Sequence, residues 1–177
     1  MRRFAVSLVL LAVACFAAFP MLLGAQAAQA QSARSIAQIV LRSWNGVGNK
    51  IITMAEDWPE AKYNYRPNAG VRTFQQVLLH VAGDNYNMLN RAAGKTLGHA
   101  ANDPTGPQYK TKAQTVAFLK KSVADGAAEI QREGDAGVLK NIGSWMGDTE
   151  HMGEHYGQLV VYYRNNRVVP PSSRPRK

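Results

Sequence analysis

Apolar residues recur at steps of three and four along most of the chain, whereas strict alternation of apolar and polar residues is never sustained. Steps of three and four place side chains on one face of an α-helix, and sustained alternation is the pattern of a strand. Four segments carry the helical pattern, with loops rich in turn-forming residues between them: residues 35–56, 73–93, 111–133 and 144–165. We therefore predict an all-α protein, a four-helix bundle.

Local signals set the ends of these helices. Residues 73–76 and 111–114 both read Thr-x-x-Gln, the capping box in which two side chains satisfy free backbone N–H groups at a helix start. Pro59 ends the first helix, because proline disfavours a helical conformation in the residue before it. Gly46 and Gly48 within that helix indicate a bend or close packing. Three further glycines predict a break between the third and fourth helices: Gly134, Gly137 and Gly143.

The first 30 residues have the pattern of a secretory signal peptide. Two arginines give a positive start, residues 4–23 carry no charge, and residues 25–30 contain two successive Ala-Gln-Ala cleavage motifs. We predict that residues 1–30 are removed, that the protein is periplasmic or secreted, and that residues 31–177 form one domain. An uncleaved anchor helix is the alternative, because about 20 apolar residues can span a bilayer.

Composition limits the function of the remaining chain. Its lack of cysteine excludes a disulfide framework and a thiol nucleophile. Because two arginines leave with the leader, 19 Lys and Arg residues remain against 12 Asp and Glu, a formal net charge of +7. An exported protein rarely meets nucleic acid, so we expect no such partner. Weak attraction to acidic envelope surfaces, or solubility alone, is the better interpretation of this charge.

Three of the four histidines form a candidate metal site. His151 and His155 lie four residues apart in the last predicted helix, so both imidazoles face one small volume, the spacing with which a helix offers two nitrogen ligands to one ion. His80 lies beside the apolar stripe of the second helix and supplies a third ligand. The alternative is an ordinary half-buried His80 and a solvent-facing pair. His99, in a polar loop, is expected to be solvated.

Asp84 follows His80 by one turn and is an unusual residue for an apolar helix face. It could orient a metal-binding histidine by contacting the far side of its ring, supply a fourth ligand, or pair with a buried arginine. Glu154 points about 100° away from His155 on a helix, so Asp84 is the better candidate to assist catalysis.

The residues around these histidines resemble the DinB-like family. The likeness spans residues 36–173, and two blocks carry it. The first is His80 with three neighbouring motifs: Tyr-Arg-Pro at residues 65–67, Val-Arg-Thr-Phe at 71–74 and Val-Ala-Gly-Asp-Asn-Tyr at 81–86. The second is the last helix and tail, from His151 to Ser173. The resemblance implies an up-down-down-up bundle, often a homodimer, that holds a divalent ion through His80, His151 and His155.

Family members are described as metal-dependent hydrolases, and some relatives transfer low-molecular-weight thiols. Three neutral imidazoles leave coordination positions open to water or a small-molecule substrate, as in catalytic zinc sites. Nitrogen ligands suit Zn, Ni, Cu or Fe, with Zn or Ni as the leading expectation. The predicted export weakens the thiol-transfer interpretation, because the thiol cofactors concerned are mainly cytoplasmic. A metal-binding bundle without catalysis, serving as a binding or stress module, is the alternative.

Overall fold

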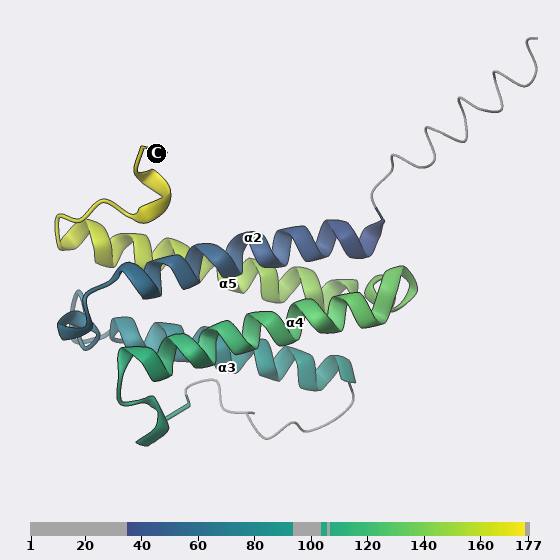
Figure 1. Cartoon of the computed structure of the whole chain (residues 1–177), viewed down its shortest axis with the longest axis horizontal. Helices are drawn as coiled ribbons and strands as arrows, with labels where there is room; N and C mark the ends of the chain where they lie inside the picture. The colour runs from purple at the N-terminus through teal and green to yellow at the C-terminus, as the bar shows by residue number, and fades with distance from the viewer. Residues whose placement is uncertain (1–34, 94–103, 106, 176–177) are drawn as a thin grey trace, which may run out of the picture. The chain divides into compact units, whose positions relative to one another are not determined.

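The structure of the protein is a computed structural model that describes residues 35–93, 104–105 and 107–175. The predicted signal peptide and His99 lie outside these residues. Four α-helices make up the bundle, and no strand occurs among the described residues (Figure 1): α2 (Ile36–Asp57), α3 (Phe74–Ala93), α4 (Lys112–Lys140) and α5 (Ile142–Asn165). Three short 3-10 helices flank them: η1 (Glu60–Lys62), η2 (Pro107–Tyr109) and η3 (Pro171–Ser173). The predicted all-α four-helix fold is confirmed.

The helices enclose one apolar core. α2 and α3 each pack against both α4 and α5. The apolar stripes seen in the sequence face inward, and the largest side chains are fully buried, among them Trp44, Trp58, Phe74, Trp145 and Tyr163. In the described part of the chain, no helix is both long enough and apolar enough to cross a membrane. The up-down-down-up order of the helices stays a prediction.

Both predicted capping boxes are present. The Thr73 backbone N–H donates to Gln76 Oε1 at 2.8 Å, and the Gln76 N–H donates back to Thr73 Oγ1 at 3.1 Å. Thr111 and Gln114 exchange the same pair of hydrogen bonds before α4. Each box satisfies N–H groups that a helix start leaves without an intrahelical partner. The starts of α3 and α4 are therefore fixed by local sequence.

The predicted break between the third and fourth helices is only partly correct. Gly134 leaves the helical conformation, with φ 60° and ψ −171°, but α4 resumes and continues through Gly137 to Lys140. Gly143 lies inside α5. Tertiary contacts outweigh the cost of about 1 kcal/mol for glycine in a helix, because Glu133 accepts hydrogen bonds from Trp145 Nε1 at 2.9 Å and Asn141 Nδ2 at 2.8 Å.

Small residues allow α2 and α4 to approach closely. A Cβ atom at Gly48 would lie 2.7 Å from Val123 Cγ1, and one at Gly126 would lie 2.2 Å from Trp44 Cζ2. The Trp44 indole donates to the Val123 carbonyl at 2.8 Å. Gly48 thus has the predicted role of close packing, whereas a Cβ at Gly46 would meet nothing within 4 Å.

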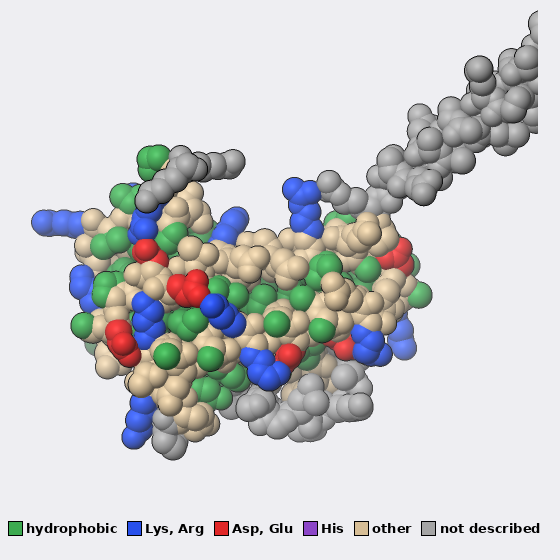
Figure 2. All heavy atoms as spheres, in the orientation of Figure 1, with side chains coloured by type: hydrophobic (Ala, Val, Ile, Leu, Met, Phe, Trp, Pro, Cys, Tyr) green, Lys and Arg blue, Asp and Glu red, His purple; other side chains and the backbone are tan. Residues whose placement is uncertain are grey.

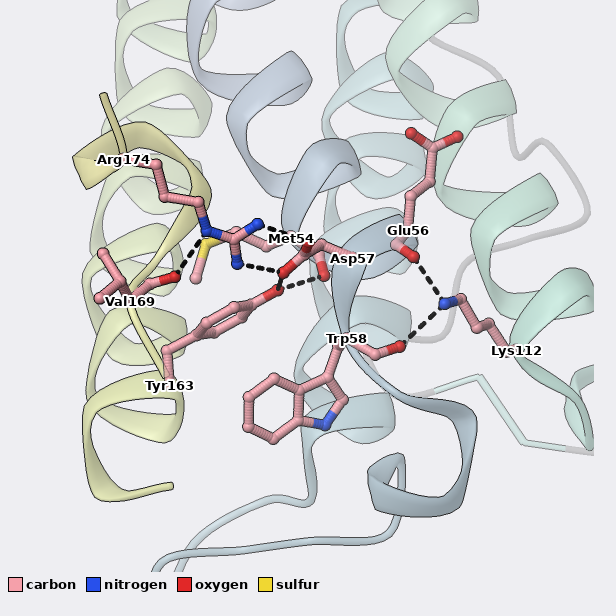
Figure 3. A network of polar contacts seen from close by, with 8 residues as sticks. All are labelled: Met54, Glu56, Asp57, Trp58, Lys112, Tyr163, Val169 and Arg174. Carbon is pink, nitrogen blue, oxygen red and sulfur yellow. Dashed lines mark hydrogen bonds and ion pairs between the residues drawn. The ribbon is translucent and has the colours of Figure 1, made fainter. Parts of the chain in front are cut away.

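Polar contacts close one end of the bundle (Figure 3). Arg174, in the tail after α5, donates to both oxygens of Asp57 at 2.8 and 2.6 Å. This hydrogen bonding, more than any other cause, holds the pKa of Asp57 below its usual value. Tyr163 Oη donates to the Met54 carbonyl at 2.9 Å, and Lys112 Nζ donates to the Trp58 carbonyl at 2.8 Å. The end of α2, the start of α4 and the tail are therefore joined.

Candidate metal centre

Three histidine rings converge between α3 and α5. His151 Nε2 lies 3.1 Å from His80 Nε2 and 2.9 Å from His155 Nε2. His155 is buried, and His80 and His151 are half-buried. Each residue offers a ring nitrogen, and these ligand atoms all lie within 4.8 Å of one another. The structure thus brings together the three histidines predicted from the sequence, in an arrangement that could hold a metal ion.

The surroundings of His155 and His151 set where their ring protons lie. His155 Nδ1 is 2.9 Å from Gln158 Oε1, and an amide oxygen only accepts, so Nδ1 carries the proton and Nε2 presents a lone pair. His151 Nδ1 faces Asp84 Oδ2 at 3.4 Å, which likewise favours the proton on Nδ1. Lone pairs at 2.9 Å repel each other unless a cation lies between them. This donor set therefore fits a divalent ion.

Burial favours the neutral form of the His151 and His155 imidazoles by lowering their pKa values. Burial lowers the pKa of His155 to about 4, despite an opposing effect of the Gln158 hydrogen bond. Burial also lowers the pKa of His151, with Asp84 acting in the opposite direction and His80 adding to the decrease. A neutral imidazole is the form that binds a metal. At neutral pH, His155 is therefore ready to act as a ligand without first losing a proton.

Asp84 lies behind the histidine cluster. It faces the Nδ1 side of His151, and the two ring nitrogens of an imidazole point in different directions. This position supports the interpretation that Asp84 orients a ligand rather than supplying a fourth one. Metal-binding histidines usually donate the second ring N–H to a carboxylate or carbonyl, whereas Asp84 lies 3.4 Å from His151 Nδ1, which makes no hydrogen bond in this structure.

Asp148 belongs to the same cluster, although the sequence interpretation did not include it. It lies on α5, three residues before His151, with 4% of its surface exposed. Asp84, Asp148 and His151 each place a ligand atom within 4.8 Å of the others. Burial raises the pKa of Asp148 to about 7, and the negative charge of Asp84 adds to the rise. The i, i+3 spacing to His151 was the signal in the sequence that could have identified it.

We predict that Asp148→Asn stabilises the metal-free protein more at about pH 8 than at about pH 4. The pKa of Asp148 rises from 3.8 to about 7 on folding. Between pH 3.8 and about 7 the folded protein therefore keeps the Asp148 carboxyl protonated, while the unfolded chain does not. The contribution of this group to the free energy of unfolding is fully present below pH 3.8 and is lost as pH rises through about 7. Asparagine keeps the shape but cannot ionise. Urea denaturation of the chelator-treated proteins measures the difference.

The exposed residue Glu150, on the same helix, provides the control for that experiment. Glu150→Gln should change the free energy of unfolding by a similar small amount at both pH values. Equal effects of Asp148→Asn at the two pH values would show that the buried carboxyl does not carry the predicted proton.

Two hollows lie near the histidine cluster, although none of the three histidines is among the described residues that line them. One, of about 340 Å³, includes Gln76 and Leu79, which precede His80 on α3. The other, of about 670 Å³, includes Gln158, the hydrogen-bond partner of His155. Arg72 lines both. The volumes lie in the range of small-molecule sites, which is about 300–1,000 Å³.

Facing helices of this four-helix bundle bring three histidines to one point. This is the arrangement with which helical proteins build metal sites between their helices. The sequence model of the DinB superfamily matches residues 46–162, about two-thirds of the chain, and this segment contains all three histidines and Asp84. The chain belongs to the DinB superfamily, as its motifs predicted. Neither a curated protein nor a solved structure matches it.

Proposed function

We propose that the protein is a metal-dependent hydrolase or group-transfer enzyme acting on a small substrate. The convergence of the Nε2 atoms of His80, His151 and His155 carries this proposal. All three donors are nitrogens, which suits Zn or Ni as the divalent ion. A bound ion with open positions would supply Lewis acidity and lower the pKa of a coordinated water toward about 7.

The chain's own residues position these ligands. Gln158 Oε1 accepts a hydrogen bond from the Nδ1–H of His155 and so keeps the Nε2 lone pair of that ring directed at the cluster. Asp84 faces the Nδ1 side of His151 and favours the same tautomer there. Rings held in this way lose less orientational freedom on binding an ion, which raises the affinity of the site.

The hollows beside the cluster favour catalysis over the alternative of a non-catalytic metal-binding bundle. A structural ion is normally enclosed by a full set of protein ligands, whereas a catalytic ion keeps a position for water or substrate. One hollow is lined by Gln76, one turn before His80, and the other by Gln158, which contacts His155, so each offers a substrate room near the histidines.

We further propose that the protein acts after export and as a homodimer. The leader pattern of residues 1–30 supports export, and the likeness to DinB-like proteins supports the dimer. Figure 2 shows Lys and Arg side chains scattered over the visible face, with Asp and Glu among them. The expectation of no nucleic-acid partner stays a prediction that rests on the proposed export. Weak attraction to acidic envelope surfaces remains compatible with this distribution of charge.

Elemental analysis of the purified protein, followed by an activity screen, tests the function. We expect about one divalent ion per chain, and hydrolysis or transfer on a panel of small esters, amides and thiol acceptors that chelation removes and metal restores. A protein that binds no divalent ion at stoichiometric level contradicts the proposal. Stoichiometric binding with no activity across the panel would favour the non-catalytic alternative.

Asp84→Asn should weaken metal binding by about 10–100-fold, less than the loss of a ligand. The amide cannot stabilise the Nδ1 proton of His151 as a carboxylate does, so the ring is less well oriented for the ion. Competition with a fluorescent chelator measures the affinity. Asp125→Asn is the matched control, because Asp125 contacts Lys121 and Tyr86 instead of the histidines. Equal metal affinities of Asp84→Asn and the wild-type protein would contradict the proposed role of Asp84 in orienting His151.

A further inference from the structure

We propose that the larger hollow is a subsite for a small carboxylate that has an apolar body, with Arg72 as the group that recognises the carboxylate. This inference rests on the proposed metal-dependent function, and it names the class of substrate. The described residues that line this hollow come from two segments, residues 67–72 before α3 and residues 158–162 of α5.

Arg72 gives the hollow its charge preference. Among the described residues that line it, Arg72 is the only charged one: Pro67, Asn68, Gly70, Val71, Arg72, Gln158, Val161 and Tyr162. A guanidinium presents five N–H donors in a planar fork that matches the two oxygens of a carboxylate, and it can keep another contact while it binds one.

Two sets of hydrogen bonds hold the backbone at Arg72 in place. The Tyr162 hydroxyl donates to the carbonyl of Arg72. The next residue, Thr73, begins the capping box of α3. A side chain that starts from a fixed backbone loses less freedom when it binds a ligand, so less of the binding energy is spent on ordering it.

Apolar side chains give the hollow its second preference. Val71 and Val161 are 39% and 50% exposed, although both are β-branched hydrophobic residues. They line the hollow together with the ring of Pro67. A hydrocarbon portion of a ligand would cover these surfaces and remove them from water, at about 25 cal/mol for each Å² buried.

The position of the hollow links it to the histidine cluster. Gln158 lines the hollow and also holds His155 at 2.9 Å. A carboxylate at Arg72 would therefore place the rest of a small molecule beside the proposed metal.

Calorimetric titration with hexanoate, acetate and hexanol, each on the metal-loaded and the chelator-treated protein, tests the subsite. We expect hexanoate to bind more tightly than either of the other probes, which lack the apolar body or the charge. Arg72→Gln should weaken hexanoate binding by at least about tenfold in both forms of the protein. Arg42→Gln, at an exposed position of α2 outside the hollow, should leave it unchanged.

A second variant keeps the test valid should Arg72→Gln disturb the fold. Val161→Asp changes an exposed position and places a negative charge in the hollow, so it should also weaken hexanoate binding while binding of hexanol changes less. Hexanoate binding that is equal in wild type and both variants overturns the subsite. Binding that disappears on chelation yet is unaffected by Arg72→Gln also overturns it, because the carboxylate then binds the metal alone. Arg72-dependent binding in a protein that holds no metal supports the subsite and contradicts only the proposed metal centre.

Discussion

The double variant His151→Ala, His155→Ala is expected to lose measurable divalent-metal binding. It removes His151 and His155, whose Nε2 atoms lie 2.9 Å apart, and leaves His80, 3.1 Å from His151 Nε2, as a single histidine ligand on α3. One neutral imidazole does not hold a divalent ion firmly in water. Isothermal titration with Zn²⁺ and Ni²⁺, with elemental analysis of the purified variant, measures the loss.

The same experiment has a readout in stability. An ion that binds only the folded state stabilises it by about 2.7 kcal/mol when its concentration is 100 times the dissociation constant. Added metal should therefore raise the melting temperature of the wild-type protein but not of the double variant. The fourth histidine supplies the control, and His99→Ala should behave as wild type. Equal metal binding by the wild type and the double variant would defeat the metal-centre interpretation.

Gly126→Ala is expected to destabilise the fold strongly. The new Cβ would lie 2.2 Å from Cζ2 of Trp44, far inside van der Waals contact. The indole has little freedom to move, because it is fully buried, donates to the Val123 carbonyl at 2.8 Å and meets the Trp145 ring edge-on at 5.5 Å. Overpacking of this kind costs about 1–3 kcal/mol and occasionally more. Urea denaturation measures the change in the free energy of unfolding.

Gly46→Ala is the matched control. It is also a glycine-to-alanine substitution, but it lies on α2, two residues from Trp44. A Cβ there meets nothing within 4 Å. Because alanine is the better helix former, this variant should be as stable as wild type or gain up to about 1 kcal/mol. If both variants gain stability, the close approach of α2 and α4 at Gly126 is not as the structure describes it.

Helix starts were predictable because their signals are local. The Thr-x-x-Gln segments at residues 73–76 and 111–114 form capping boxes whatever else the chain does, and Pro59 prevents the first helix from continuing. The end of the third helix was not predictable in the same way. Gly134 does interrupt it, but Glu133 then anchors Asn141 and Trp145, and these contacts join residues that the local pattern treats as separate.

The candidate site likewise has residues that the sequence could identify and residues that it could not. The spacing of His151 and His155 on one helix fixes their common face, so this pair could be recognised from the sequence. Gln158 and Arg72 gave no comparable signal, and the i, i+3 spacing of Asp148 to His151 did not show that Asp148 is buried. An aspartate on an exposed helix face and one that is almost fully buried beside Asp84 look the same in a sequence, since burial depends on which helix covers the position.

The sequence by itself determined the helical class of the protein, the starts of its helices and the residue types able to bind a metal, because periodicity, capping and ligand chemistry act over a few neighbouring residues. Only the tertiary structure decided that His80 meets the pair on α5, that Asp84 faces the far side of His151, and that Gln158, which contacts His155, also lines a hollow with Arg72. These relations join residues about 70 positions apart, and they arise when the apolar faces of α3 and α5 are buried in one core.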